Sequence, residues 1–168
     1  MPDGWSLKAL SHMRLLPDQF ERSDALMAEG QFVEATARLR EALRFHPTNV
    51  SVMVRLARAL NASEKAPDAS SLLAQAREAI PDSPGLLTAS AEVAAALGRG
   101  QEALDWARRA VAMAPQLPEV HVAEANAWLA LENDAAAAAA LEKALERAPT
   151  DVGLLVQLGD LEWHNLGR

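Results

Sequence analysis

Apolar residues along this chain recur every three or four positions, in paired segments that are separated by a short polar break. This spacing puts the apolar side chains on one face of an α-helix, so each segment of roughly 12–15 residues predicts an amphipathic helix. Two of the breaks read AEGQF at 28–32 and LGRGQ at 97–101, where Gly30, Gly98 and Gly100 favour a turn. The pattern therefore predicts helical hairpins without β-strands between residues 30 and 150.

The hairpins repeat at an interval of 34 residues. Four prolines are each separated by that interval: Pro47, Pro81, Pro115 and Pro149. Two rows of alanine and one row of large residues with a single substitution keep the same register: Ala35, Ala69, Ala103 and Ala137; Ala42, Ala76, Ala110 and Ala144; Leu39, Leu73, Ala107 and Leu141. Self-similarity at one fixed period is typical of repeat proteins, and we interpret the chain as one.

Each row has a physical role. The two alanine rows lie seven residues apart on the second helix of each hairpin, so they share a face. Small side chains there let another helix approach closely, because the distance between helices depends on the side chains at the contact. Proline then ends the second helix, because it has no amide hydrogen and disfavours helix in the residue before it. The run of alanines at 135–140 is thus predicted to be a rigid second helix rather than a flexible tether.

Cap residues fit the same frame. Asn49 and Asp151 suit the N-caps of first helices, and Pro84 and Pro118 suit a first helical turn. Asp134 is predicted to cap the helix that holds the alanine run.

A 34-residue helix–turn–helix with small residues at places 8, 20 and 27 and proline at place 32 resembles the tetratricopeptide repeat. The matching copies are 16–49, 50–83, 84–117 and 118–151, with a half repeat at 152–168. The resemblance implies an all-α fold, a right-handed α-solenoid of four helix-turn-helix repeats plus a terminal helix. Residues 1–15 are expected to form an N-terminal extension or capping helix.

The N-terminal segment has two interpretations. Its apolar residues fall at helical spacing with basic residues among them: Trp5, Ala9, Leu10, Met13 and Leu16, beside Lys8, His12 and Arg14. We favour a helix or arm that covers the first repeat; the alternative is a short helix on a membrane surface.

Composition excludes several classes of function. The net charge of −7 and the pI near 5.1 argue against nonspecific binding to nucleic acid, which needs a basic surface. The chain has no cysteine, and no apolar run approaches the roughly 18 residues of a membrane span. The histidines at 12, 46, 121 and 164 lack partners at metal-ligand spacing. We therefore expect no metal, no cofactor and no enzymatic activity, and a cytoplasmic location.

The resemblance implies that the first helices line a concave groove that binds a peptide or protein segment. The residues expected to line the groove are Phe20, Asp24, Met27, Val54, Arg55, Arg58, Asn61, Thr88, Glu92, Val122, Asn126, Leu129 and Trp163. Arg55 and Arg58 suit an acidic group on the partner; the alternative is that both arginines are only solvated on this face or pair with Glu92. The carboxylate clamp of chaperone-binding family members is absent, because its lysine and asparagine places hold other residues.

The half repeat is open to two interpretations. It is either a terminal capping helix or the start of a further hairpin in a longer chain, which we favour. Leu155, Leu158 and Gly159 occupy the packing places of a first helix. Four further residues add apolar surface and suggest self-association as a homo-oligomer: Leu154, Val156, Leu161 and Trp163.

Three functions remain open from the sequence. The first is a noncatalytic scaffold that binds a protein or peptide in its groove. The second is an N-terminal region that recruits substrates or partners for a larger enzyme, such as a group-transferase or hydroxylase. The third is a self-association module.

Overall fold

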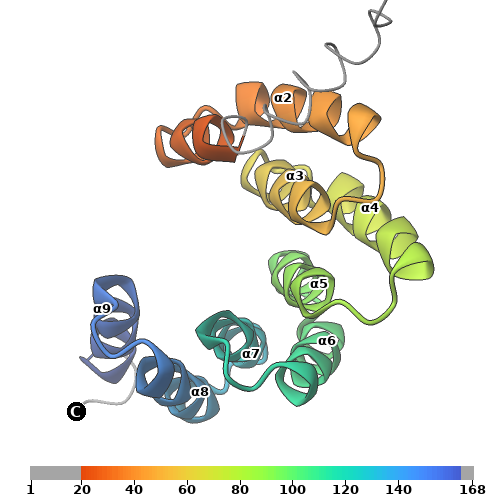
Figure 1. The fold of residues 1–168 in the computed structure, drawn as a ribbon. Coiled ribbons are helices and arrows are strands. Elements are labelled where there is room, and N and C mark those ends of the chain that lie inside the picture. Colours follow the sequence, from red (N-terminus) through yellow and green to blue (C-terminus); the bar gives the residue numbers. More distant parts are fainter. Residues whose placement is uncertain (1–19, 164–168) are drawn as a thin grey trace, which may run out of the picture.

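The computed structural model of the chain describes residues 20–163, which form an arc of antiparallel helical hairpins (Figure 1). Residues 20–28 are helical, and eight labelled helices follow them: α2 (Phe32–Phe45), α3 (Val50–Ala62), α4 (Ala66–Ala79), α5 (Pro84–Ala96), α6 (Gly100–Met113), α7 (Pro118–Ala130), α8 (Asp134–Arg147) and α9 (Val152–Leu161). No β-strand occurs within residues 20–163, so the predicted all-α fold is confirmed. The predicted extension at 1–15 lies outside the described residues.

The helices form two layers that follow the curve of the arc. The first helices of the hairpins (residues 20–28, α3, α5, α7 and α9) are called A helices here, and the second ones (α2, α4, α6 and α8) are called B helices. Figure 1 shows α3, α5 and α7 on the inner side of the arc, with the B helices outside them. Every extensive contact among the labelled helices joins neighbours in the chain or helices one apart. The described chain is therefore an open solenoid, as predicted, and not a closed bundle.

The prolines set the helix ends. Each B helix ends two residues before one of the regularly spaced prolines, at Phe45, Ala79, Met113 and Arg147. The proline ring disfavours helical dihedrals in the residue before it, and these four residues have φ between −142° and −132° and ψ between 59° and 75°, outside the helical region. The next A helix begins three residues after each proline, so helix boundaries repeat with the period of the sequence.

The alanine rows form the contacts between helices. The first row is completely buried, as are the alanines at the eighth place of three A helices: Ala35, Ala69, Ala103 and Ala137; Ala57, Ala91 and Ala125. Within the alanine run, Ala137, Ala138 and Ala140 are buried, whereas Ala135 and Ala139 are exposed. Three of the six alanines thus pack in the interface, and the run is a helix rather than a tether.

Two cap predictions are confirmed and one is wrong. The side chains of Asn49 and Asp151 accept hydrogen bonds from the backbone amides three residues later, at 3.2 and 3.1 Å. The cap of α8, however, is Asn133, whose Oδ1 accepts from the amide of Ala136 at 3.0 Å. Asp134 is instead the first helical residue, where its charge favours the positive end of the helix dipole.

The turns inside the hairpins explain two of the three glycines. Gly30 and Gly98 have φ values of +74° and +71°, a region that favours glycine. Gly100 is not a turn residue, because it begins α6. A Cβ at Gly100 would lie 2.8 Å from the Leu131 side chain, so its role is to let α6 approach the turn between α7 and α8. Among the described helices, none is long and apolar enough to span a membrane.

Candidate functional site: the concave groove

A cavity of about 300 Å³ opens where the first two A helices meet. Its lining comes from the segment 20–28, α2 and α3: Ser23, Asp24, Met27, Leu39, Val54, Arg55 and Arg58. The apolar part consists of Leu39, which is buried, and of Met27 and Val54, which are half-buried. The rim carries the charged groups. The cavity thus combines an apolar floor with a polar edge, as ligand pockets commonly do.

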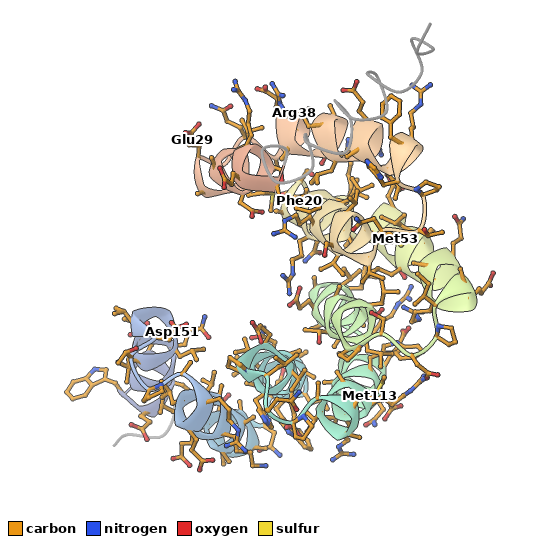
Figure 2. The ribbon with its side chains drawn as sticks, viewed as in Figure 1. Phe20, Glu29, Arg38, Met53, Met113 and Asp151 are labelled. Atoms are coloured by element: carbon orange, nitrogen blue, oxygen red, sulfur yellow. The ribbon has the colours of Figure 1, made fainter. Side chains whose placement is uncertain are left out.

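Arg55 is held in place by residues of the preceding hairpin. Its Nε and Nη2 donate to the two carboxylate oxygens of Asp24, at 3.0 and 3.2 Å. Its guanidinium carbon also lies 4.4 Å from the centre of the Phe20 ring, and Figure 2 shows Phe20 beside α3 on the inner side of the arc. A bidentate ion pair and a cation–π contact together fix the direction of this side chain.

Arg58 links the second hairpin to the third. Its Nε and Nη2 each donate to a carboxylate oxygen of Glu92 at 2.8 Å. These hydrogen bonds raise the pKa of the Arg58 guanidinium, and nearby negative charges add to this effect against the opposing effect of burial. Because the raised pKa lies above the ordinary value for arginine, the Arg58 guanidinium is charged across the neutral range. The stability that comes from this raised pKa is lost as the pH rises through it.

The alternative in which an arginine pairs within the chain is therefore the one observed. Arg58 pairs with Glu92 as that alternative predicted, and Arg55 pairs with Asp24, a pairing that the sequence did not indicate. An acidic group on a partner would have to displace one of these carboxylates. With Glu119 also exposed on the same face, the groove in this region carries three acidic and two basic side chains.

The structure distributes the other predicted groove residues along the arc. Asn61, Val122 and Asn126 are half-buried, while Leu129 and Trp163 are exposed. Thr88 was predicted to line the groove, but this is wrong. It is only 2 % exposed, and its hydroxyl donates to the carbonyl of Pro84 at 2.8 Å. Because it is buried, Thr88 offers no surface to a ligand.

Two lining residues were missed by the sequence reasoning. Leu39 reaches the cavity from a B helix, whereas only places on A helices had been considered. Its row of large residues was visible in the sequence and could have identified it. Ser23 lies beside it, and its hydroxyl donates to the carbonyl of Phe20 at 2.9 Å.

Two residues that lie outside the cavity, His121 and Trp106, have structural partners. His121 is buried, with its Nε2 2.9 Å from the carbonyl oxygen of Pro115. Trp106 is half-buried, with the guanidinium groups of Arg77 and Arg109 over its ring at 4.2 and 4.8 Å. No group of three or more His, Asp or Glu side chains within residues 20–163 is arranged to hold a metal ion.

The predicted self-association surface on α9 needs correction. Leu154 and Leu161 are both only 6 % exposed and pack against α8, so they are not available to a partner. Val156 and Trp163 are exposed as predicted, and Val152 and Leu155 join them. The packing and exposed faces of α9 were therefore assigned incorrectly, because Leu154 and Leu161 take the places at which α3, α5 and α7 bury apolar residues.

Fold and groove together define an α-helical repeat solenoid with a concave inner face. Residues 26–93 match the family model described as tetratricopeptide repeat. This match identifies tetratricopeptide repeats in residues 26–93, and the hairpins that follow continue the same 34-residue period and fold. No match was found among curated proteins.

Several solved structures have the same fold. TTC0263, a thermophilic TPR protein of Thermus thermophilus, is 22 % identical over 95 % of both chains, with a TM-score of 0.76. MamA of Desulfovibrio magneticus is 18 % identical over 86 % of this chain and 82 % of its own, with a TM-score of 0.61. The first TPR domain of human RPAP3 is 20 % identical over 68 % of this chain and 90 % of its own, with a TM-score of 0.62. At these identities the likeness shows the fold alone.

Proposed function

We propose that this protein is a noncatalytic scaffold that binds a peptide or protein segment in its concave groove. Tetratricopeptide repeat folds commonly serve as protein–protein interaction scaffolds, and this chain has that fold. The observation that carries the proposal is the cavity between the segment 20–28 and α3, with its apolar floor and charged rim.

The cavity suits one apolar side chain of a partner as an anchor. Met27 and Val54 are half-buried, so a side chain that covers them removes further apolar surface from water. Asp24 and Arg55 form one side of the rim and are already fixed by their ion pair and by the contact of Arg55 with the Phe20 ring. A preformed rim reduces the ordering that binding requires, which favours affinity.

The charges on this face indicate what flanks the anchor. Asp24, Glu92 and Glu119 outnumber Arg55 and Arg58, and both arginines already have carboxylate partners. We therefore propose a peptide whose apolar anchor has neutral or basic neighbours, in place of the acidic partner that the sequence suggested.

The test is to select peptides from a random display library on the full chain and to measure their affinities by fluorescence anisotropy. Val54→Trp fills the cavity and should weaken the selected peptides at least tenfold. The matched control, Val33→Trp, adds the same side chain at an exposed place on α2, outside the cavity lining, and should leave the affinity unchanged. Met27→Gln, which makes the floor polar, provides a second variant if the tryptophan disturbs folding. Peptides that bind both cavity variants as tightly as the wild type would refute the proposal.

A further inference from the structure

The end of the solenoid at α9 presents an apolar face. Val152, Leu155, Val156 and Trp163 are 70, 50, 55 and 75 % exposed. At the place of Leu155, the three preceding A helices have Met53, Leu87 and His121, all of which are buried. This place therefore belongs to the core of an internal hairpin and is open at α9.

Gly159 shows that this face suits the approach of another helix. It lies inside α9, and a Cβ built on it would meet no heavy atom within 4 Å. Glycine weakens a helix interior, so its presence calls for a packing reason that α8 does not provide. The same place holds Ala57, Ala91 and Ala125 in the other A helices, and all three are completely buried. A small residue here leaves room for a closely packed partner.

The charge around the apolar face of α9 indicates which kind of partner can bind there. Residues 151–163 contain three acidic residues, Asp151, Asp160 and Glu162, and no lysine or arginine. Two α9 faces that paired with each other would bring these like charges together, which disfavours a symmetric contact. A basic apolar segment is complementary instead.

Such a segment exists at the other end of this chain. Residues 5–16, WSLKALSHMRLL, contain Lys8 and Arg14 with no acidic residue, and their apolar residues recur at helical spacing. This segment lies outside the described residues. Its length of 12 residues is similar to that of α9, which has 10. The adjoining segment 20–28 offers little apolar surface to residues 5–16, because it exposes the charged Arg22 and the small Ala25 at places where α3 buries Leu56 and Ala59.

We propose that segment 5–16 of one copy binds the α9 face of a second copy. The segment 20–28 and α9 lie at opposite ends of the arc (Figure 1), so the contact joins copies head to tail. An interface between two different surfaces of the same chain forms rings if the rotation closes and filaments if it does not. This interaction is separate from the concave groove and does not depend on its ligand.

Sedimentation velocity of the full chain over a concentration series tests the proposal. The wild type should associate as its concentration rises, and salt should weaken the association because it screens the charges. Gln157→Lys/Glu162→Lys on the face and Lys8→Glu/Arg14→Glu in the segment should each shift association to at least tenfold higher concentration. An equimolar mixture of the two variants should restore it, since each then offers the other a complementary pair. Arg40→Glu/Arg44→Glu, a reversal of two exposed charges on α2, is the matched control and should behave as the wild type.

Binding of a labelled peptide of residues 5–16 identifies the surface. The peptide should bind the wild type and the Val54→Trp groove variant equally, and bind Leu155→Lys at least tenfold more weakly. A scrambled peptide of the same composition should not bind. A strictly monomeric wild type, or a peptide lost from Val54→Trp, would overturn the proposal. Unchanged association of Lys8→Glu/Arg14→Glu would also overturn it and would indicate that α9 pairs with itself.

Discussion

One backbone place in each hairpin turn requires an unusual conformation. Gly30, Glu64, Gly98 and Glu132 are spaced by the repeat interval, and all four have positive φ, between 57° and 74°. A side chain in this left-handed region is strained by about 1–2 kcal/mol, because its Cβ comes close to the backbone. Two turns thus use the residue that fits this conformation, and two accept a strained glutamate.

Replacing either glutamate by glycine should relieve this strain. Glu64→Gly and Glu132→Gly should each raise the free energy of unfolding by up to about 1 kcal/mol, since glycine also loses more entropy on folding. Urea denaturation followed by circular dichroism measures the change. Gly98→Ala, the reverse substitution at the equivalent place, should lower stability by a similar amount. A loss of stability in both glutamate variants would contradict the strain argument.

Individual residues of the groove were only partly predictable. Their places in the repeat indicated the A-helix face, and this was sufficient for Met27, Val54 and Arg55. The ion-pair partners were harder to predict, because the pairing of Arg55 with Asp24 depends on side-chain directions in two helices. The prediction that Thr88 lines the groove was wrong because the same place in the repeat differs in burial from one hairpin to the next.

The B helices show how the repeat is held together at the scale of an element. In α8, Ala137 and Ala144 are completely buried and Leu141 lies between them in the same interface. Interiors of proteins are close-packed, so an interface of this kind has no space for a larger side chain. Alanine at these places is therefore a packing requirement, beyond its high helix propensity.

A larger side chain at one of these places should disrupt the contact between α7 and α8. Ala137→Leu should lower the free energy of unfolding by about 1–3 kcal/mol through overpacking. Ala139→Leu, two residues away on the exposed side of α8, is the matched control and should change it by less than about 0.5 kcal/mol. Thermal and urea denaturation of both variants measure the difference. Equal stability of the two would contradict the observed register of α8.

Element boundaries were predictable where a residue acts through its own backbone. Proline disfavours helix in the residue before it through its own ring, so the B-helix ends follow from the sequence. N-cap residues are harder to predict from the sequence. Asn133 and Asp134 are both of residue types that are common at the N-cap, and only the structure shows which of them occupies it. The packing face of α9 was assigned incorrectly because apolar residues occur on most of its sides, including Leu154 and Leu155. Periodicity cannot identify a packing face when the pattern is apolar all round.

At the scale of the molecule, the described chain is nearly one-dimensional. Extensive contacts reach only the next one or two helices, so each hairpin is stabilised by its immediate neighbours. The helices α5, α6 and α7 have neighbours on both sides, whereas α9 makes its extensive contact with α8. Local stability should therefore fall from the middle of the arc towards its ends.

Hydrogen exchange measured by mass spectrometry tests this gradient. Amides of α5, α6 and α7 should exchange most slowly, and those of residues 20–28 and α9 most rapidly, because end helices open without unfolding the centre. Leu154→Ala, which removes a buried contact with α8, should accelerate exchange in α9 and leave α3 unchanged. Uniform protection along the chain, or an equal effect of this variant on α3, would show a single cooperative unit instead.

The regular helix boundaries also bear on how such a chain changes over evolution. Removing residues 84–117 would join Ser83 directly to Pro118, and the residue after Ser83 is already a proline, Pro84, that opens an A helix. The new junction would resemble the existing one, with the same cap residue and a proline at the same first helical position. In-frame recombination within the gene can therefore delete or duplicate an entire hairpin without creating a new type of junction between hairpins. The arc can therefore lengthen or shorten during evolution by one whole hairpin at a time. Every remaining helix then still packs against a neighbour of the same type.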